Sequence, residues 1–143
     1  MNIAIVGATG NVGRKTLEVL EKKEISIENL YLVASPKSAG KKIKFQGKEI
    51  EVYNLENFDF SKVKIAFFAA GGKISEKFAE KAAKYCLVID NSSFFRMDPN
   101  VPLVVPQVNS DDLNNIKKNI IANPNCSTAQ LVIALKPLHD LFA

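Results

Sequence analysis

An apolar strand that leads through a glycine-rich loop into a helix constrains the fold of this chain more than any other feature. Residues 2–6 (NIAIV) form an apolar stretch, as in a strand buried on both faces of a parallel sheet. Gly7, Gly10 and Gly13 punctuate the loop that follows directly. The helix after the loop is predicted to carry Val12, Thr16, Val19 and Leu20 on one face.

Strand, glycine loop and helix in this order are the setting of a dinucleotide-binding fingerprint. The spacing here is GxxGxxG instead of GxGxxG, and it still places glycine where the backbone must approach a pyrophosphate. The same glycines would also suit a tight turn that only allows the helix and the strand to pack closely. The order of the elements favours nucleotide binding, with the structural turn as the alternative.

The second predicted strand, residues 30–35, indicates which dinucleotide is bound. An NAD enzyme usually ends this strand with an acidic residue that binds the ribose 2′-hydroxyl. Here the strand ends at Ser35, with Lys37 and Ser38 close behind, and the nearest acid, Glu28, lies before the strand. Small hydroxyls and a lysine suit a 2′-phosphate, which favours NADP as the cofactor.

Three further apolar stretches, residues 64–70, 87–90 and 119–122, are predicted strands that alternate with helical segments. Gly71 and Gly72 follow the first of them and would again let a ligand approach the backbone. This alternation predicts an α/β fold: an open, mostly parallel, doubly wound sheet of the Rossmann type with helices on both faces.

Residues 90–98 (DNSSFFRMD) place polar side chains directly after a buried strand. Arg96 within this loop is suited to bind a phosphate or a carboxylate through two N–H donors. The alternative is an ordinary surface ion pair between Arg96 and Asp98. The sequence is equally compatible with both.

A cysteine follows the last predicted strand at the start of a predicted helix. Pro124 keeps the residue before it out of a helix, and Asn125 can cap the turn that follows. Cys126 is therefore predicted in or near the first helical turn, where free N–H groups and the helix dipole favour a thiolate. The alternative is a small apolar side chain in a turn. Cys86, in contrast, is predicted to be an inert core residue.

The composition excludes several classes of protein. A chain of 143 residues with 47% hydrophobic and 24% charged residues is typical of one globular domain. The net charge of +4 suits small anionic ligands better than nucleic acid, and no apolar run approaches the roughly 20 residues of a membrane span. The start of the chain enters a strand at once, unlike a secretory signal. Two cysteines without metal-ligand spacing predict no metal site and a reducing, cytoplasmic location.

A nucleotide-binding half combined with an activated cysteine suggests a covalent oxidoreductase. The thiolate would attack an acyl carbon, and a bound nicotinamide would exchange hydride with the thioester. Such a reaction also needs an acid–base group beside the sulfur. His139, the only histidine, follows Cys126 by thirteen residues on the same predicted helix, which is about 20 Å away. The base is therefore expected to come from sequence outside these residues.

Three motifs closely resemble aspartate-semialdehyde dehydrogenases: GATGNVG at 7–13, DNSSFFRMD at 90–98 and NPNCST at 123–128. The last is the most specific, since the related N-acetyl-glutamyl-phosphate reductases have a glycine before the cysteine and glyceraldehyde-phosphate dehydrogenases have two threonines after it. The resemblance covers essentially the whole chain but only the amino-terminal part of that family. It implies an NADP-binding domain at 1–125 and the first helix of a catalytic and dimerisation domain at 126–143.

The resemblance implies NADPH-dependent reductive dephosphorylation of 4-phospho-L-aspartate to L-aspartate 4-semialdehyde, on the route to lysine, threonine and methionine. Cys126 would be the nucleophile that forms the acyl-enzyme, with Arg96 and Asn125 at the substrate phosphate. Lys37 stands where the family commonly has arginine, so the charge is kept and the guanidinium fork is lost. The implied cofactor residues are Gly7, Thr9, Gly10, Asn11, Val12, Gly13, Ser35, Lys37, Ser38, Gly71 and Gly72.

The same resemblance implies that the catalytic histidine and most of the dimer interface lie in the carboxyl-terminal part of the family. The chain alone is therefore expected to be inactive. A complete protein is expected to be a homodimer or a dimer of dimers, with a small-molecule substrate and no nucleic-acid or membrane partner.

A different class of protein is the alternative: a non-catalytic NADP-binding module or sensor of the kind related to short-chain reductases. Active short-chain reductases carry a Tyr-x-x-x-Lys pair, and none of the three tyrosines here has a lysine four residues later. The module interpretation requires that Cys126 is unreactive while the cofactor still binds.

Overall fold

The computed structural model describes residues 1–23 and 25–142, and seven segments of this part are β-strands: β1 (Asn2–Val6), β2 (Asn29–Ala34), β3 (Lys42–Phe45), β4 (Lys48–Asn54), β5 (Ile65–Phe68), β6 (Leu87–Asp90) and β7 (Ile120–Ala122). They form one sheet in the order β3-β4-β2-β1-β5-β6-β7. Neighbouring strands pair in parallel except β3 and β4, which form an antiparallel hairpin. The predicted mostly parallel sheet of the Rossmann type is confirmed.

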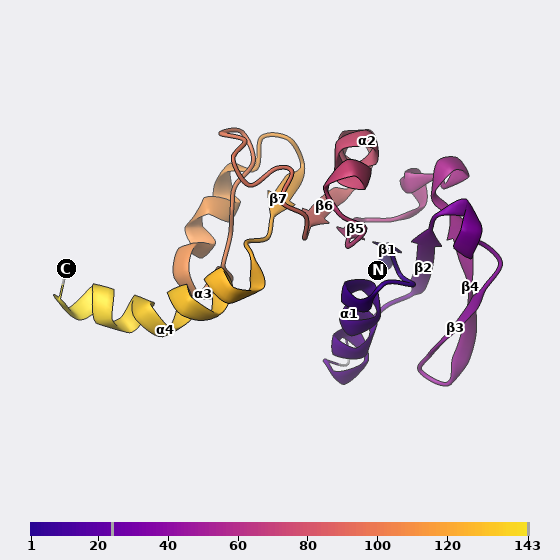
Figure 1. Cartoon of the computed structure of the whole chain (residues 1–143), viewed down its shortest axis with the longest axis horizontal. Coiled ribbons are helices and arrows are strands. Elements are labelled where there is room, and N and C mark those ends of the chain that lie inside the picture. Colours follow the sequence, from indigo (N-terminus) through magenta and orange to yellow (C-terminus); the bar gives the residue numbers. More distant parts are fainter. Residues whose placement is uncertain (24, 143) are drawn as a thin grey trace.

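Helices lie on both faces of the sheet, with α1 (Asn11–Lys22) on one face and α2 (Gly72–Ala83) on the other (Figure 1). The winding reverses between β1 and β5: β1 leads through α1 to β2, whereas β5 leads through α2 to β6 on the other side. A reversal of this kind leaves a crevice at the carboxyl ends of the strands. The remaining helical segments are α3 (Pro106–Asn109), α4 (Cys126–Phe142) and 3-10 turns at Pro36–Ser38, Leu55–Asn57, Phe60–Lys62 and Ser110–Asn115.

The larger part of the apolar core lies between the sheet and α2. Phe68 of β5, Val88 of β6 and Ile120 of β7 are fully buried on this side, and α2 packs Phe78 and Ala82 against them. A second, smaller core lies between α1 and the β1–β2–β4 part of the sheet. Buried and half-buried residues alternate along β5 and β6, because α2 covers these two strands on one face only.

The face of α1 predicted from the sequence is only partly packed. Of its residues only Leu20 is buried, while Val12 and Val19 are 53% and 44% exposed. They line a hollow of about 520 Å³ together with Phe67 of β5 and Ile89 of β6. The reason is the position of α1: it buries Gly13, Leu17 and Leu20 against β1 and β2, so its other apolar residues face the uncovered side of the neighbouring strands.

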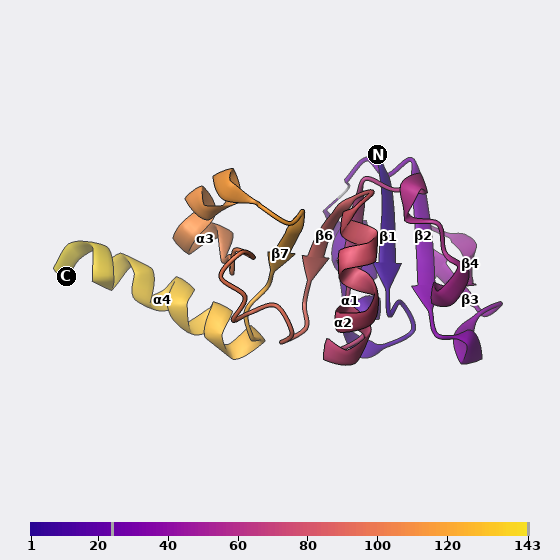
Figure 2. The same cartoon turned by 90° about the horizontal axis from the view of Figure 1, so that it is seen from above.

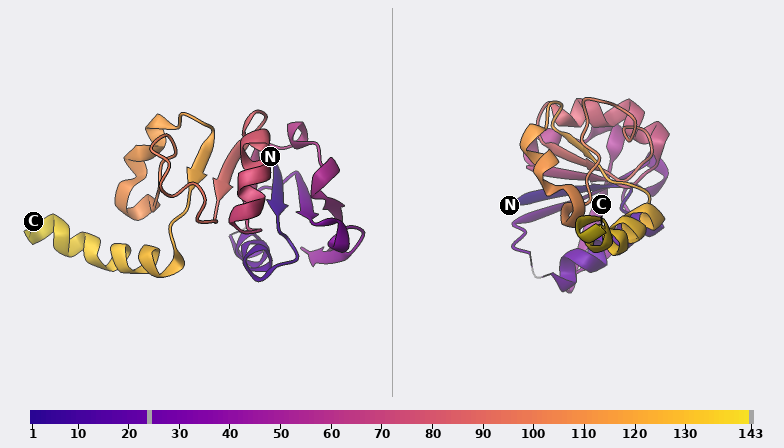
Figure 3. Two further views of the ribbon diagram at one scale, coloured as in Figure 1. Left: turned by 45° about the horizontal axis from the view of Figure 1, so that its top comes forward. Right: turned by 90° about the vertical axis from the view of Figure 1, so that its left-hand side faces the viewer.

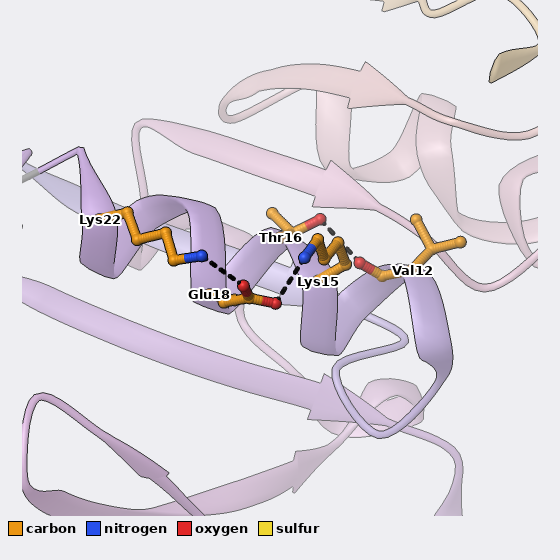
Figure 4. A network of polar contacts seen from close by, with 5 residues as sticks. All are labelled: Val12, Lys15, Thr16, Glu18 and Lys22. Carbon is orange, nitrogen blue, oxygen red and sulfur yellow. Dashed lines mark hydrogen bonds and ion pairs between the residues drawn. The ribbon is translucent and has the colours of Figure 1, made fainter.

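The outward side of α1 carries a charged cluster in which Glu18 lies between Lys15 and Lys22, 2.7 Å from each ammonium group (Figure 4). Hydrogen bonds from the two lysines lower the pKa of Glu18 to about 2. The adjacent Thr16 hydroxyl donates to the carbonyl of Val12 at 2.9 Å. The first turn of the helix itself contains no carboxylate.

Helix α4 extends away from the sheet and rests on α3 (Figures 2 and 3). None of its described residues is buried, and Leu131, Leu138 and Phe142 are well exposed. Pro137 lies inside the helix without ending it. Among the described residues, no helix is long and apolar enough to cross a membrane.

Gly13 is required for α1 to approach the loop after β1, which makes it a test of this packing. A Cβ at position 13 would lie 2.2 Å from the carbonyl oxygen of Gly7, a backbone atom that cannot move aside. We expect Gly13→Ala to lower the free energy of unfolding by about 3 kcal/mol, measured by urea denaturation.

Gly72→Ala is the matched control, because a Cβ there meets nothing closer than 3.9 Å. Its stability should stay within about 0.5 kcal/mol of the parent chain. Equal stability of the two variants would contradict the close contact between α1 and the loop.

Candidate active site

A hollow of about 340 Å³ lies at the carboxyl ends of β1, β2 and β5, where the winding of the sheet reverses. Thr9 and Gly10 of the glycine loop line one side, and Ser35 lines another at the end of β2. Ala70 and Ile74, at the start of α2, complete it. The glycine loop and the end of β2, which the sequence analysis assigned to a cofactor, therefore border the same space.

The backbone of the glycine loop is shaped for close approach. Gly7 has a φ of +87°, and a Cβ there would lie 2.7 Å from the carbonyl oxygen of Ala69. No side chain caps the start of α1 at Gly10, so the first backbone N–H groups of the helix remain free to donate hydrogen bonds. Free N–H groups at a helix start beside a glycine loop suit a pyrophosphate. Gly13 has the role of the alternative stated for the glycines, because it allows the helix and the strand to pack closely. Asn11 and Val12 form the first turn of the helix.

Lys37 and Ser38 lie in the 3-10 turn that follows β2. Lys37 is exposed, and in the part of the chain that the structure describes no carboxylate pairs with it. Ser38 is half-buried, and its backbone N–H donates to the carbonyl of Ser35 at 2.9 Å. This turn presents one cation and two hydroxyls just past the hollow.

The loop after β6 and the end of β7 are joined through Arg96. Its Nε donates to the carbonyl oxygen of Asn123 at 3.0 Å, and one terminal nitrogen donates to the carbonyl oxygen of Asn91 at 3.2 Å. The side chains of Asn91 and Asn123 are themselves hydrogen bonded at 2.8 Å. The guanidinium group is therefore fixed beside the segment that leads to Cys126, three residues after Asn123.

The alternative partner of Arg96, Asp98, is occupied elsewhere. Its carboxylate accepts from the backbone N–H of Asn100 at 2.9 Å and from Lys118 Nζ at 2.9 Å, and these contacts lower the pKa of Asp98 in that order. No carboxylate is paired with Arg96 among the ion pairs of residues 1–23 and 25–142. Arg96 therefore keeps an uncompensated charge and unused N–H donors, since a guanidinium carries five.

Cys126 is the first residue of α4, as the sequence predicts, and its side chain is exposed. The side-chain oxygen of Asn125 caps the helix by accepting from the backbone N–H of Ser127 at 3.0 Å and from its hydroxyl at 2.6 Å. Cys126 Sγ lies 3.6 Å from the same oxygen. The thiol therefore sits at an ordered helix start with solvent access.

The other two groups that the sequence analysis set aside are far from this chemistry. Cys86 is buried, its Sγ faces the carbonyl of Ala82 at 3.4 Å, and burial raises its pKa to about 11. His139 is 75% exposed and lies 3.7 Å from Asp140 on the same continuous helix as Cys126. A separation of thirteen helical residues is about 20 Å, so the imidazole cannot reach the sulfur.

The start of α2 connects the cofactor hollow with the Arg96 loop. Gly71 precedes the helix with a φ of +86° and has no side-chain cap. A Cβ on Gly72 would lie 3.9 Å from atoms of Ser93 and Phe94, which places the loop after β6 beside this helix start. The cofactor hollow and the Arg96 loop are thus neighbours along one edge of the sheet.

Asn91 and Asn123 are not among the site residues predicted from the sequence. Each directly follows a strand, and β6 and β7 pair in parallel with Asp90 opposite Ala122. That register brings the two side chains together. The available signal was an asparagine immediately after each of two apolar strands, but nothing in the sequence stated that the strands are adjacent.

Comparisons with known proteins agree with this geometry. A family profile described as "Semialdehyde dehydrogenase, NAD binding domain" matches residues 2–116. An aspartate-semialdehyde dehydrogenase from Aquifex aeolicus is 54% identical over 142 residues, which are 96% of this chain and 42% of that protein. The chain thus spans about two fifths of the length of the curated relatives it matches.

Solved structures similar to this chain include aspartate semialdehyde dehydrogenases. The crystal structure of aspartate semialdehyde dehydrogenase II from Vibrio cholerae, complexed with ASA, has a TM-score of 0.95 and 52% identity and covers 97% of this chain and 46% of its own. A Candida albicans aspartate semialdehyde dehydrogenase with NADP has a TM-score of 0.77 and 29% identity, over 99% of this chain and 48% of its own.

The two thiols should differ in reactivity, because one is exposed at a helix start and the other is buried. We expect iodoacetamide at about pH 7 to label Cys126 at least about tenfold faster than Cys86, as read by peptide mapping after brief exposure. Cys86 should stay largely unlabelled at this pH in the folded chain, because it is buried and burial raises its pKa to about 11. Cys126→Ser is the control and should abolish the fast label. Faster labelling of Cys86 would remove the main support for a nucleophile.

Proposed function

This chain belongs to the semialdehyde dehydrogenase family, and on that premise we propose that it carries the cofactor-binding and nucleophile-bearing part of an NADPH-dependent aspartate-semialdehyde dehydrogenase. One observation carries the proposal: an exposed cysteine at a helix start lies three residues past a carbonyl that anchors an arginine with free donors. The glycine-loop hollow lies along the same edge of the sheet. The curated relatives that this chain matches are named aspartate-semialdehyde dehydrogenases.

In the proposed reaction, the thiolate of Cys126 attacks the acyl carbon of 4-phospho-L-aspartate. The carbon–oxygen bond to phosphate breaks, and the thioester of an acyl-enzyme forms. The first N–H groups of α4, the helix that begins at Cys126, would stabilise the oxyanion that develops on the acyl oxygen. The unused donors of Arg96 bind the departing phosphate, which needs a cation that is not already neutralised.

The cofactor, when bound, supplies the hydride that reduces the thioester to the aldehyde. The residues proposed to hold it are the glycine loop, Ser35 at the hollow, and Lys37 and Ser38 beyond it. Phosphate of the dinucleotide would meet the free N–H groups of α1. The 2′-phosphate of NADP would meet the cation and the hydroxyls after β2, where no acidic residue stands to hold a free ribose hydroxyl.

Cofactor choice can be measured directly. Calorimetric titration should show that NADPH binds about tenfold more tightly than NADH, and that this preference weakens as salt rises because the 2′-phosphate contact is between exposed charges. Lys37→Glu should reduce or reverse the preference. Lys48→Glu, which makes the same charge change in the exposed hairpin, should not. Equal affinity for the two cofactors in the parent chain would overturn the assignment of NADP.

We further propose that residues 1–125 act as the cofactor-binding unit and that 126–143 begin the catalytic and dimerisation unit. Hydride transfer to an acyl-enzyme needs a proton donor about 3 Å from the reacting oxygen. His139 lies too far along α4 to serve, and curated relatives are considerably longer than this chain. The proton donor and the groups that hold the substrate's amino and carboxylate ends would then come from the part that only the longer proteins contain.

The chain by itself is therefore expected to bind NADPH and show no turnover. The measurement is a steady-state assay with aspartate semialdehyde, NADP and phosphate or arsenate. Adding the separately expressed carboxyl-terminal portion of a full-length relative should restore some activity if the two associate. Robust activity of the chain alone that disappears in Cys126→Ala would show that the base lies within these residues, contrary to the proposal.

A further inference from the structure

A buried carboxylate lies beneath the Arg96 loop and takes no part in the proposed reaction. Asp90 is the last residue of β6 and is fully buried. Its Oδ1 accepts from the Ser75 hydroxyl of α2 at 2.7 Å and from the backbone N–H of Ser92 at 3.1 Å, and its Oδ2 accepts from the Ser92 hydroxyl at 2.7 Å. Among the described residues, no cation pairs with it. A buried charge held only by hydrogen bonds depends on every one of them.

The direction of the Ser92 hydroxyl is fixed by its second partner. Ser92 Oγ accepts from the backbone N–H of Phe94 at 3.1 Å, so its own hydrogen is directed to Asp90. Asp90 therefore holds the loop at two places, directly at the N–H of Ser92 and through the hydroxyl at the N–H of Phe94. Loss of the carboxylate would leave several donors unsatisfied in a buried region, which costs more than the loss of one hydrogen bond.

Both carbonyls that anchor Arg96 belong to residues tied to Asp90. Asn91, whose carbonyl accepts from a terminal nitrogen of Arg96, lies between Asp90 and Ser92 in the chain. Asn123, whose carbonyl accepts from Arg96 Nε, donates its backbone N–H to the carbonyl of Asp90 at 2.8 Å. The tie to Asn123 uses the backbone of Asp90, so the Asp90 side chain acts on the guanidinium group through the conformation of the loop that carries Asn91 and Arg96.

We infer that Asp90 is a positioning residue: held by Ser75 and Ser92, its carboxylate sets the Asn91–Arg96 loop so that the guanidinium group of Arg96 stays anchored at Asn91 and Asn123, three residues before Cys126. The phosphate role of Arg96 rests on the proposed function. The positioning of Arg96 can be measured without it. These hydrogen bonds also join α2, which borders the cofactor hollow at Ile74, to the loop that carries Arg96.

The first readout is the Nε–H of Arg96 by ¹⁵N NMR in the chain of 143 residues. Its hydrogen bond to Asn123 should slow exchange with water. Asp90→Asn replaces one acceptor oxygen by a donor amide and should speed that exchange at least about tenfold. Ser92→Ala should do the same, while Ser92→Thr, which keeps the hydroxyl, should restore the parent rate.

Val88→Ala is the control for loss of stability alone, because Val88 is buried in the same strand and makes no contact with the loop through a side-chain hydrogen bond. It should lower Tm and leave the Arg96 signal unchanged. If neither Asp90→Asn nor Ser92→Ala changes the exchange of Arg96 Nε–H beyond what Val88→Ala does, the inference is wrong. Should Asp90→Asn fail to fold, the comparison of Ser92→Ala with Ser92→Thr decides the question.

The second readout is titration with inorganic phosphate at constant ionic strength, followed on Arg96 and on the first amides of α4. Phosphate should bind the parent chain and Ser92→Thr alike, and about tenfold more weakly to Asp90→Asn and Ser92→Ala. Absence of phosphate binding in the parent chain would count against the proposed function and leave the exchange result standing. Phosphate affinity that is unchanged in Asp90→Asn would overturn the positioning role.

Discussion

The contact of three backbone segments at Gly7 governs the rest of this structure. The loop after β1 passes so close to Ala69 that a side chain at position 7 would meet a carbonyl at 2.7 Å, and α1 approaches the same loop so closely that position 13 has no room for a Cβ. These two approaches fix the start of α1 against the ends of β1 and β5. The reversal of winding opens the crevice, and glycine at both positions lets the loop and α1 form its wall.

Arg96 shows how a protein can immobilise a cation without neutralising it. A carboxylate partner would hold the guanidinium group equally well, but an incoming anion would then have to compete with it. Two carbonyl oxygens, of Asn91 and Asn123, orient the group through their dipoles and leave its full charge for a ligand. The pairing of Asp98 with Lys118 removes the nearest competitor in the sequence. The loop therefore separates the task of orientation from the task of charge compensation.

Most of the fold could be predicted from the sequence, because buried parallel strands are apolar throughout and the glycine loop specifies the first crossover. The position of Cys126 was also predictable, since Pro124 and Asn125 determine locally where α4 begins. The ion-pair partner of Asp98 was not predictable, because Lys118 follows Asp98 by twenty residues and reaches it only through the tertiary fold. The exposed side of α1 was missed for a similar reason: periodicity shows which residues share a face and does not show what covers it.

The helix that begins with Cys126 has a further consequence for the thiol. Because α4 buries none of its described residues, tertiary packing contributes little to its formation, and its seventeen residues are close to the length at which isolated helices are marginal in water. Its persistence depends on the Asn125 cap and on local pairs such as Lys136 with Asp140. The free N–H groups at the start of α4, which the proposed reaction uses for the oxyanion, exist only while the first turn is wound. The proposed role of Cys126 is thus coupled to a helix–coil equilibrium, and anything that packs against α4 would support that role by holding the first turn in place.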